Sequence, residues 1–578
     1  MKALKKIMTP ARTIGAIALV GALALGACGS SGLASSRHAA ATATVADAGS
    51  NGDTTAPPTA SDALAANAEA SYVEDSDWKA SDAVDVTLSG TTAASSSAAV
   101  SASDGVLTIS SAGVYRLSGS FDGKVVVAAG AKDRVVLILD NATITSSTGA
   151  AIEATSGDDL VLALEGTSTV TDGSYDGTED ANAAIYVDMD LTITGSGTLN
   201  VTSGASDAVT STDDLYVLSG TINATASDDG LRGKDSLTIA GGTVAVASGG
   251  DALKSDQDND DTKGYVNISG GALTLTSGGD GIDASTDAIV TGGTLSITSG
   301  GGAASGKPST GSAKGIKAST YVIVDGGTID VDSGDDAIHS NGALRLSSGT
   351  ITAASTDDGI NASGSITVEE GLAATAETAS DTASTETSDT ATSGDAAAQM
   401  GPGGMGDGGG TMEDTGEQLT ITGGTITVNA NGDGLDSNGS LTISGGETTV
   451  YGPASGANSS LDSNGTMSIT GGTVVAFATN EMVETPTTTD GQGWISASAT
   501  GSAGSTVTIT DSSGTILGTY TSLKAFGNVI YSTAGMTNGA TYTVSVDGSA
   551  TEATAGQGGM GMGGQPPAGG QPPAAPQG

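Results

Sequence analysis

The chain has 578 residues, of which 90 are glycine and only 3% are aromatic. So few large side chains could not fill an ordinary globular core, and stacked short strands with small β-branched residues suit this composition better. The formal net charge of −46 excludes electrostatic binding to nucleic acid, which needs a basic surface, and it creates a demand for cations.

Residues 1–27 have the features of a bacterial lipoprotein signal peptide. Four basic residues precede an apolar run from Ile14 to Leu25, which is too short for a stable membrane span. The run ends in Leu-Gly-Ala-Cys28, which resembles a lipobox, whose Cys is diacylated and becomes the mature N-terminus. Cys28 is the only Cys, so no disulfide can form within the chain. A free Cys in an uncleaved leader is the alternative. We expect a lipid anchor at Cys28 and a location on the extracellular face of the cell membrane.

Three stretches lack hydrophobic periodicity and are predicted to be disordered. They are a spacer over residues 28–75, an insertion over 373–417 and a tail over 551–578. The first two are rich in Ala, Ser, Thr and Asp, and the tail in Gly, Pro and Gln, so none can bury a core.

Between these stretches lies an internal repeat built on the phrase Gly-Gly-Thr, with minor variants. The phrase recurs every 22 residues wherever no insertion intervenes, and residues 373–417 interrupt an otherwise continuous series. The third position of the phrase falls at Thr198, Thr221, Thr243, Ala272, Thr294, Thr328, Thr350, Thr425, Glu447 and Thr473.

Each repeat alternates apolar and polar residues between Gly or Asp corners, which predicts short strands and leaves no room for a helix. For example, the strand ending at Ile239 precedes one starting at Thr243, and a turn leads to Leu253. We therefore predict an all-β protein, a right-handed single-stranded parallel β-helix with about 22 residues per coil and coils about 4.8 Å apart. The helix is expected over 76–372 and 418–480, and 481–550 as a C-terminal β cap or a small separate β domain.

A second phrase, Asp followed by Gly or Ala and then Ile, Leu or Val, lies about eight residues after the first. Residues one period apart stack directly, so these carboxylates are predicted to form a row, with Lys314 in place of one Asp. Turn chemistry explains one or two of them. However, charges about 4.8 Å apart repel by roughly 3–4 kcal/mol at an effective dielectric constant near 20, and Ca²⁺ would relieve that repulsion. The candidate metal ligands are Asp207, Asp228, Asp229, Asp251, Asp280, Asp283, Asp335, Asp336, Asp357, Asp358, Asp433 and Asp436.

Three residues further on lies a row of mixed charge. Cations beside carboxylates suit an anionic sugar, but they could equally serve only to neutralise the nearby Asp residues, and the residues leave both readings open. A Ser-His-Asp triad would have to use His339, because His38 lies in the spacer, so a triad is not expected. The row consists of Arg232, Lys254, Asp283, Lys317, His339, Asn361, Asp436 and Asp462.

The ordered series NAAIYVDMDLTITGSGTL, DDGLRGKDSLTIAGG, GDALKSD, KGIKAS, DDAIHSN, DDGINASG and GDGLDSNG resembles the carbohydrate-binding parallel β-helix family of bacterial surface proteins. That family is similar in architecture to pectate-lyase-like helices. The resemblance implies Ca²⁺ at the Asp cluster and binding, without cleavage, of an acidic or cellulose-like polysaccharide. The candidate carbohydrate-binding residues are Arg232, Lys254, Lys314, Lys317 and His339.

The expected function is therefore that of a non-catalytic, monomeric surface lipoprotein that binds polysaccharide and Ca²⁺. One alternative is a Ca²⁺-dependent polysaccharide lyase, in which Lys254 or Lys317 would abstract the proton α to a uronate carboxylate. The other is a structural surface protein or adhesin, in which the acidic row serves only stability.

Overall fold

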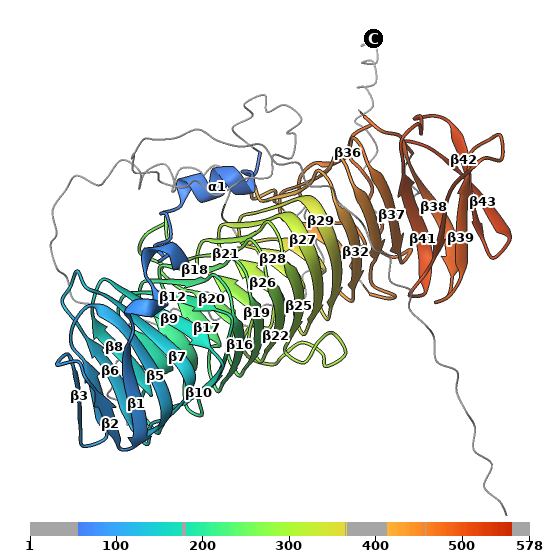
Figure 1. The fold of residues 1–578 in the computed structure, drawn as a ribbon. Coiled ribbons are helices and arrows are strands. Elements are labelled where there is room, and N and C mark those ends of the chain that lie inside the picture. Colours follow the sequence, from blue (N-terminus) through green and yellow to red (C-terminus); the bar gives the residue numbers. More distant parts are fainter. Residues whose placement is uncertain are drawn as a thin grey trace, which may run out of the picture. The chain divides into compact units, whose positions relative to one another are not determined.

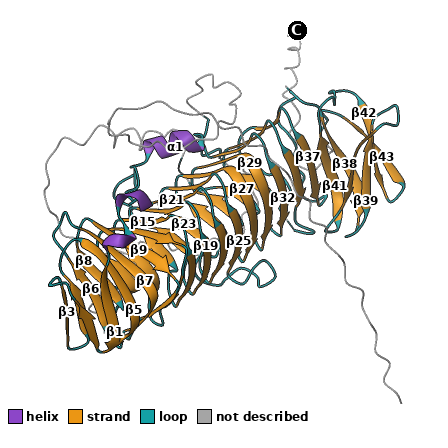
Figure 2. Cartoon of the chain, in the orientation of Figure 1, coloured by secondary structure: helices purple, strands orange, loops and turns teal. Residues whose placement is uncertain are grey.

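In the computed structural model, the described residues are 56–175, 181–364, 366, 413–456, 458–489 and 491–557. They form an all-β structure with long parallel sheets, which confirms the all-β part of the fold prediction (Figures 1 and 2). The signal peptide, Cys28 and residues 373–412 of the predicted insertion lie outside the described residues. Within the part of the chain described, no helix has the length and apolar character that a membrane span requires.

Three rows of parallel strands are stacked coil upon coil, in the arrangement of a parallel β-helix (Figure 1). One coil consists of β18 (Ser236–Ile239), β19 (Thr243–Ser248) and β20 (Leu253–Ser255). Strand pairing joins residues one sequence repeat apart, such as Leu215 with Leu237 and Thr221 with Thr243. The repeat in the sequence is therefore the repeat of the sheet register.

The third row forms a 13-stranded sheet among the described residues, called the site sheet below. Its strands are β3 (Val100–Ser103), β4 (Val106–Ile109), β6 (Lys124–Ala128), β8 (Ile152–Ser156), β11 (Ala183–Val187), β14 (Asp207–Ser211), β17 (Leu231–Gly233), β20, β23 (Ile282–Ala284), β26 (Ile316–Ala318), β28 (Ile338–Ser340), β30 (Ile360–Ala362) and β33 (Leu435–Ser437).

The other two rows merge into one 26-stranded sheet in the described part of the chain, because β27 and β29 each run through both rows. Besides β18 and β19, its strands are β1 (Val84–Gly90), β2 (Thr92–Ser95), β5 (Gly113–Asp122), β7 (Arg134–Thr145), β9 (Asp159–Glu165), β10 (Thr167–Thr171), β12 (Asp190–Gly195), β13 (Thr198–Thr202), β15 (Asp214–Val217), β16 (Thr221–Ala226), β21 (Tyr265–Ile268), β22 (Ala272–Ser277), β24 (Asp287–Val290), β25 (Thr294–Ser299), β27 (Tyr321–Ser333), β29 (Ala343–Ser355), β31 (Gln418–Ile421), β32 (Thr425–Ala430), β34 (Ser440–Ile443), β35 (Glu447–Tyr451), β36 (Met467–Ile469), β37 (Thr473–Ala478), β38 (Trp494–Gly501) and β41 (Phe526–Ser532).

Columns of aliphatic side chains fill the interior of the coils, because alternate residues of every strand point inward. In the site sheet one such column includes Leu231, Leu253, Ile282 and Leu435, and these side chains are fully buried. Each fully buried aliphatic side chain stabilises the fold by about 1.5–3 kcal/mol. A stack of small coils can therefore hold together without a large aromatic core.

Glycine follows several of the Asp residues in the predicted row, because the interior leaves no space there for a side chain. A Cβ on Gly281 would lie 2.3 Å from Ile297 Cγ2 and 2.5 Å from the carbonyl oxygen of Gly315. We expect Gly281→Ala to lower the free energy of unfolding by about 1–3 kcal/mol, as overpacking does. Urea unfolding measures this, with Gly204→Ala as the control, since a Cβ on Gly204 meets nothing within 4 Å. Equal stability of the two variants would contradict the packing argument.

The ends of the stack carry antiparallel strands. At the N-terminal end β1 pairs with β2, and β3 with β4. At the C-terminal end β41 pairs antiparallel with β37, and β38 pairs antiparallel with β41, so both extend the large sheet. Beside them lies a four-stranded sheet of β39 (Thr506–Thr510), β40 (Ile516–Thr521), β42 (Thr541–Val546) and β43 (Ser549–Thr554). The segment predicted as either a cap or a small domain thus supplies both a cap and a small sheet.

The prediction of a spacer without structure is wrong for residues 56–75. Residues 56–78, called the N-terminal strap below, lie along the outside of the large sheet and include the helix α1 (Ala60–Ala66). The apolar residues of α1 pack against Ile289, Tyr321 and Ile323, and Val73 packs against Val136 and Ile138. The strap is ordered because these outward-facing strand residues offer it an apolar surface. The 3-10 turns Asp75–Asp77 and Ala80–Asp82 then lead into β1.

Two other boundaries of predicted disorder also need correction. Residues 413–417 are described, and Glu417 is fully buried and accepts a hydrogen bond from the backbone N–H of Gly364 at 3.2 Å. Residues 551–554 complete β43, which pairs along its length with β42. On both sides of the insertion the coils stack directly, as the pairing of Thr350 with Thr425 shows.

Candidate functional site

The site sheet carries a continuous line of outward-facing side chains, called the central row below. From Arg232 onward its members occupy the middle position of three-residue strands, so the strand register places each one beside the next. The 22-residue repeat predicted this alignment from Arg232 to Asp436. In order, the central row consists of Thr210, Arg232, Lys254, Asp283, Lys317, His339, Asn361 and Asp436.

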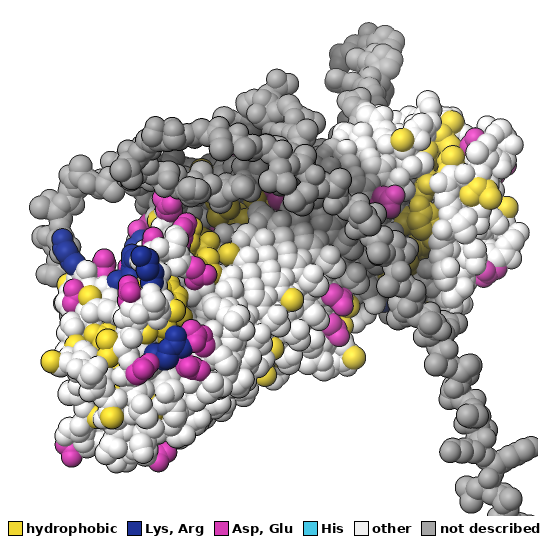
Figure 3. Space-filling view, in the orientation of Figure 1, with side chains coloured by type: hydrophobic (Ala, Val, Ile, Leu, Met, Phe, Trp, Pro, Cys, Tyr) yellow, Lys and Arg dark blue, Asp and Glu magenta, His cyan; other side chains and the backbone are white. Residues whose placement is uncertain are grey.

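Few charged side chains lie on the opposite flank of the coils. Figure 3 shows that the face over β16, β19, β22 and β25 is mostly free of Lys, Arg, Asp and Glu, and that most of the basic side chains visible there lie over the first coils, beside acidic ones. Exposed residues of these strands are small and uncharged, for example Asn223, Thr274 and Ser296. The central row is therefore the more strongly charged strip of these coils.

Beside the central row the predicted Asp residues form a ladder held together by hydrogen bonds. The Asp ladder consists of Asp207, Asp229, Asp251, Asp280, Asp336, Asp358 and Asp433. One oxygen of each carboxylate accepts the backbone N–H of the next coil: Asp229 to Asp207 at 3.1 Å, Asp251 to Asp229 at 2.8 Å, Asp280 to Asp251 at 2.7 Å, Lys314 to Asp280 at 2.7 Å, Asp358 to Asp336 at 3.2 Å, Asp433 to Asp358 at 2.7 Å, and Ser459 to Asp433.

These bonds give the ladder a structural role. Each backbone N–H needs an acceptor oxygen one coil below it, which a carboxylate or an amide side chain can supply. A buried N–H without an acceptor would cost about 1–3 kcal/mol, so each carboxylate stabilises the turn above it. This is a form of the turn chemistry that the sequence left open as an alternative to metal binding. The second oxygen of each carboxylate remains for other partners.

Over most of the ladder those other partners are basic side chains. Lys254 Nζ lies 3.1 Å from Asp229 and 2.9 Å from Asp251, and Lys317 Nζ lies 3.4 Å from Asp280 and 2.9 Å from Asp283. Burial lowers the pKa of Lys254, but the hydrogen bond and the charges of its two carboxylate partners outweigh it, so that the pKa rises. Arg232 lies 3.8 Å from Asp207 and 2.7 Å from Asp256.

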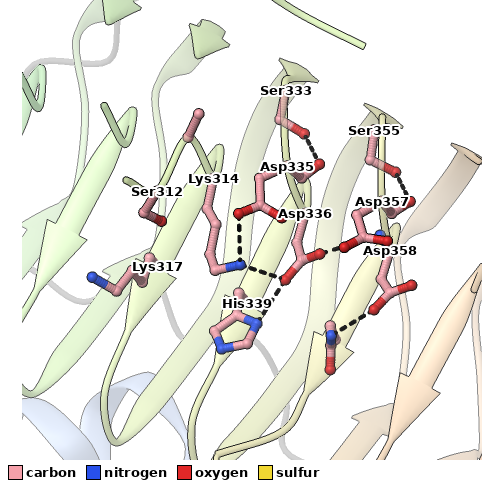
Figure 4. Close-up of polar contacts among 12 residues, drawn as sticks. Ser312, Lys314, Lys317, Ser333, Asp335, Asp336, His339, Ser355, Asp357 and Asp358 are labelled. Atoms are coloured by element: carbon pink, nitrogen blue, oxygen red, sulfur yellow. Dashed lines mark hydrogen bonds and ion pairs between the residues drawn. The ribbon is translucent and has the colours of Figure 1, made fainter. Parts of the chain in front are cut away.

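The same pairing occurs at Asp336 (Figure 4), which is only 3% exposed. Lys314 Nζ lies 2.7 Å from one Asp336 oxygen, and His339 Nδ1 lies 2.9 Å from it. Burial raises the pKa of Asp336, but its hydrogen bond to His339 and the positive charge of Lys314 outweigh burial and bring it down to about 2. Asp335 and Asp357, just before the ladder, contact Lys307.

The C-terminal part of the ladder differs, because no basic side chain forms an ion pair with it among the described residues. We call Asp358, Asp433, Asp436, Asp462 and Glu484 the acidic end. Burial, with the charges of Asp336 and Asp357, raises the pKa of Asp358 to about 7. Burial and the charges of its acidic neighbours raise the pKa of Asp436 to about 8. The pKa of Asp433 is raised to about 6 and that of Glu484 to about 7, again chiefly by burial.

An unsatisfied oxygen lies beside these carboxylates. Asn361 is 6% exposed and its amide donates to Asp358 at 2.8 Å, while its Oδ1 atom has no hydrogen-bond partner in the described structure. Asn361 is also in register with Asp436 of the next coil. Carboxylate and amide oxygens are the ligands that Ca²⁺ prefers, so the donor set of the acidic end fits a hard cation.

Three groups of carboxylates outside the acidic end are compact enough for a shared ion. In each group one oxygen per residue lies within 4.8 Å of the others. Basic side chains already contact members of all three groups, and Asp228 is the exposed member of the first. The groups are Asp207, Asp228 and Asp229; Asp251, Asp280 and Asp283; and Asp335, Asp336 and Asp357.

Sequence reasoning missed Lys307 and Glu484 because neither lies on the repeat. Lys307 belongs to the long insertion between β25 and β26, and Glu484 to the loop after β37, where it accepts from the backbone of Ser463 at 3.2 Å. One signal for Lys307 was available in the sequence: it is a basic residue within an insertion that begins beside the acidic row. Nothing local in the sequence indicates Glu484.

A further acidic recess, of about 400 Å³, lies between the strap and the large sheet. It is lined by Glu69 of the strap and by several Asp residues with a single base, Lys263, which lies 2.7 Å from Asp235. Burial raises the pKa of Asp214 in this recess to about 6. No sequence motif indicates this recess, because it depends on the strap being in place.

Residues 103–359 match the model of a family described as "Carbohydrate-binding domain-containing protein". A protein of that description from Acetivibrio thermocellus is 32% identical over 135 residues, which are 22% of this chain and 47% of the relative, so the match spans about half of the relative's length. A solved structure described as a polysaccharide lyase-like protein from C. thermocellum, a gadolinium derivative, is 27% identical, with a TM-score of 0.39, over 42% of this chain and 96% of that one. The predicted resemblance to a carbohydrate-binding family is confirmed.

Proposed function

From the carbohydrate-binding family match over residues 103–359, we propose that this chain binds an acidic, pectin-like polysaccharide along the site sheet, with Ca²⁺ held by the Asp ladder. The binding surface would lie on a right-handed β-helix with about 22 residues per coil. The observation that carries the proposal is the central row, a straight line of charged side chains at the spacing of strands. A linear polymer can contact such a line over several coils.

Calcium has a specific role in this proposal because the chain and the polymer are both anionic. A protein of net charge −46 repels a polyuronate unless cations lie between them. Asp358, Asp433 and Asp436, with the Oδ1 atom of Asn361, would hold the ion, since their charges are not offset by basic side chains. Bound there, Ca²⁺ would neutralise the carboxylates and offer coordination positions to uronate oxygens.

The acid–base geometry favours binding over lyase chemistry. A lyase base must lose its proton near the working pH. Lys317 is paired with Asp280 and Asp283, and although burial lowers its pKa, the charges of these partners raise it more. Lys254 is held in the same way. Neither lysine is therefore poised to abstract a proton, which supports a non-catalytic module.

The lipobox-like sequence before Cys28 supports a lipid-anchored location on the outer face of the cell membrane. Fractionation of cells that express Cys28→Ser tests this, because the wild type should stay in the membrane fraction and the variant, which lacks the acylated Cys, should leave it.

Retention on polygalacturonate is the direct test of the function. We expect the full chain to bind polygalacturonate in Ca²⁺, and a chelator to weaken binding at least about tenfold, which corresponds to about 1.4 kcal/mol. Mg²⁺ should replace Ca²⁺ poorly, because it demands a smaller and more regular ligand cage. Asp436→Asn should bind more weakly than Asp330→Asn, an exposed carboxylate on another strand row.

Three results would contradict the proposal in whole or in part. Steady release of unsaturated product, seen by its absorbance, would favour the lyase. Retention on cellulose alone would remove the acidic specificity. Failure to bind any polysaccharide or Ca²⁺ would favour a structural surface protein.

A further inference from the structure

A small recess lies on the site sheet near the N-terminal end of the central row. Its volume is about 260 Å³, and it spans three successive coils. This is below the roughly 300–1,000 Å³ of pockets for drug-sized ligands, so it suits a single sugar ring. Its lining includes Asn182, Tyr186, Thr210, Thr212, Arg232 and Lys234.

Lys234 distinguishes this recess from the rest of the ladder. Its ammonium group forms no ion pair among the described residues, whereas Arg232, Lys254 and Lys317 are each paired with two aspartates. Two hydrogen bonds fix the backbone of Lys234. Its N–H donates to the carbonyl oxygen of Ser211 at 3.0 Å, and its carbonyl oxygen accepts from the Ser255 hydroxyl at 3.1 Å. This half-buried cation stands on a fixed backbone and forms no ion pair among the described residues, so it is available for an anion.

The acidic groups around the recess are already engaged. Asp207 accepts from Thr210 at 2.9 Å and from Asn182 at 3.3 Å, and it lies 3.8 Å from Arg232. Asp188 accepts from Thr212 at 2.8 Å. These bonds hold the polar lining in place and leave the charge of Lys234 uncompensated.

Tyr186 supplies an aromatic wall. It is in register with Thr210 of the next coil, is half-buried and borders the recess. Aromatic rings pair an apolar face with a polar edge, and the apolar face of a sugar ring can lie against such a surface. The recess therefore combines a cation, hydroxyl and amide groups, and an aromatic ring within one small volume.

We propose that this recess binds one carboxylate-bearing sugar residue, with the Lys234 ammonium paired to the sugar carboxylate and the Tyr186 ring against the sugar face. The inference rests on the proposed polysaccharide binding and names a specificity subsite within it. This contact needs no metal, so it is separate from the acidic end at the far end of the same row.

Calorimetric titration of the full chain with oligogalacturonate, in chelator and in Ca²⁺, tests the subsite. We expect Lys234→Gln to weaken binding about tenfold in both conditions. Binding of the methyl-esterified oligomer, which lacks the charge, should be unchanged. Tyr186→Ala should weaken binding of both oligomers. The control is Lys132→Gln, which removes the same charge from an exposed turn. Its binding should equal that of the wild type.

The outcomes separate the subsite from the wider proposal. If the wild type binds oligogalacturonate and Lys234→Gln binds it equally well, the subsite is wrong while the function stands. If Lys234→Gln weakens the binding of both oligomers equally, the lysine does not pair with the sugar carboxylate, and the assignment also fails. If the wild type binds neither oligomer in Ca²⁺, the proposed function fails first. An unchanged melting temperature of Lys234→Gln would show that the fold is intact.

Discussion

Replacing Asp336 by alanine is expected to lower the free energy of unfolding by about 3–5 kcal/mol, the cost of removing one partner from a buried ion pair. The variant removes the acceptor for the backbone N–H of Asp358 and the carboxylate that pairs with Lys314 and His339. All of these groups would then lack their main partner in a nearly dry environment. Urea unfolding at neutral pH measures the loss.

The same variant has a signature in its pH dependence. The pKa of Asp336 is depressed to about 2 in the folded state, against about 3.9 for an unperturbed Asp. Its stabilisation is therefore complete above about pH 4 and is lost as the pH falls toward 2. The gap between wild type and Asp336→Ala should narrow over that window. Asp330→Ala, an exposed carboxylate on β27, should change stability by no more than about 0.5 kcal/mol. A small loss in Asp336→Ala would mean that the ladder is not structural.

The position of the ladder could be predicted from the sequence, but the use of each carboxylate could not. The 22-residue spacing of Asp229 and Asp251 places them one coil apart, and the register confirms it. Which oxygen accepts a backbone N–H depends on how the turn orients that N–H, which no spacing reveals. The basic side chains that neutralise the carboxylates could not all be predicted either, since Lys307 contacts Asp335 from an insertion outside the repeat.

The strap was missed for a different reason. Its own sequence is small and polar, which is typical of linkers, and its order comes from the surface that it covers. The signal lay in strands where inward and outward residues are both apolar, such as Val135 to Leu139 in β7 and Tyr321 to Val324 in β27, all of them buried. Continuous apolar runs indicate a strand that is covered on both faces.

The acidic end is expected to make calcium binding and stability depend strongly on pH. The folded-state pKa values of Asp358 and Asp436, about 7 and about 8, lie above those of an unfolded chain. The folded protein therefore holds protons more tightly, and the free energy of unfolding should fall as the pH rises from about 4 through 8. In chelator, the melting temperature at pH about 8 should lie several degrees below that at about 5.5.

Calcium should reverse this loss only where the carboxylates are ionised. At pH about 8, an ion at a hundred times its dissociation constant adds about 2.7 kcal/mol to the free energy of unfolding. At pH about 5.5 protons compete for the same oxygens, so the added stability should be much smaller. Scanning calorimetry with Ca²⁺ and with chelator, at both pH values, gives the four melting temperatures needed.

The double variant Asp358→Asn with Asp436→Asn should separate this site from the rest of the ladder. Asparagine keeps an oxygen that can accept the N–H of Asp433, now bonded to Asp358 at 2.7 Å, but it carries no charge. The variant should therefore be more stable than the wild type in chelator at pH about 8 and should lose most of the calcium effect. Asp85→Asn with Asp330→Asn removes two exposed charges and should leave both effects intact. A full calcium effect in the first variant would place the ion elsewhere, with Asp207, Asp228 and Asp229 the next group to test.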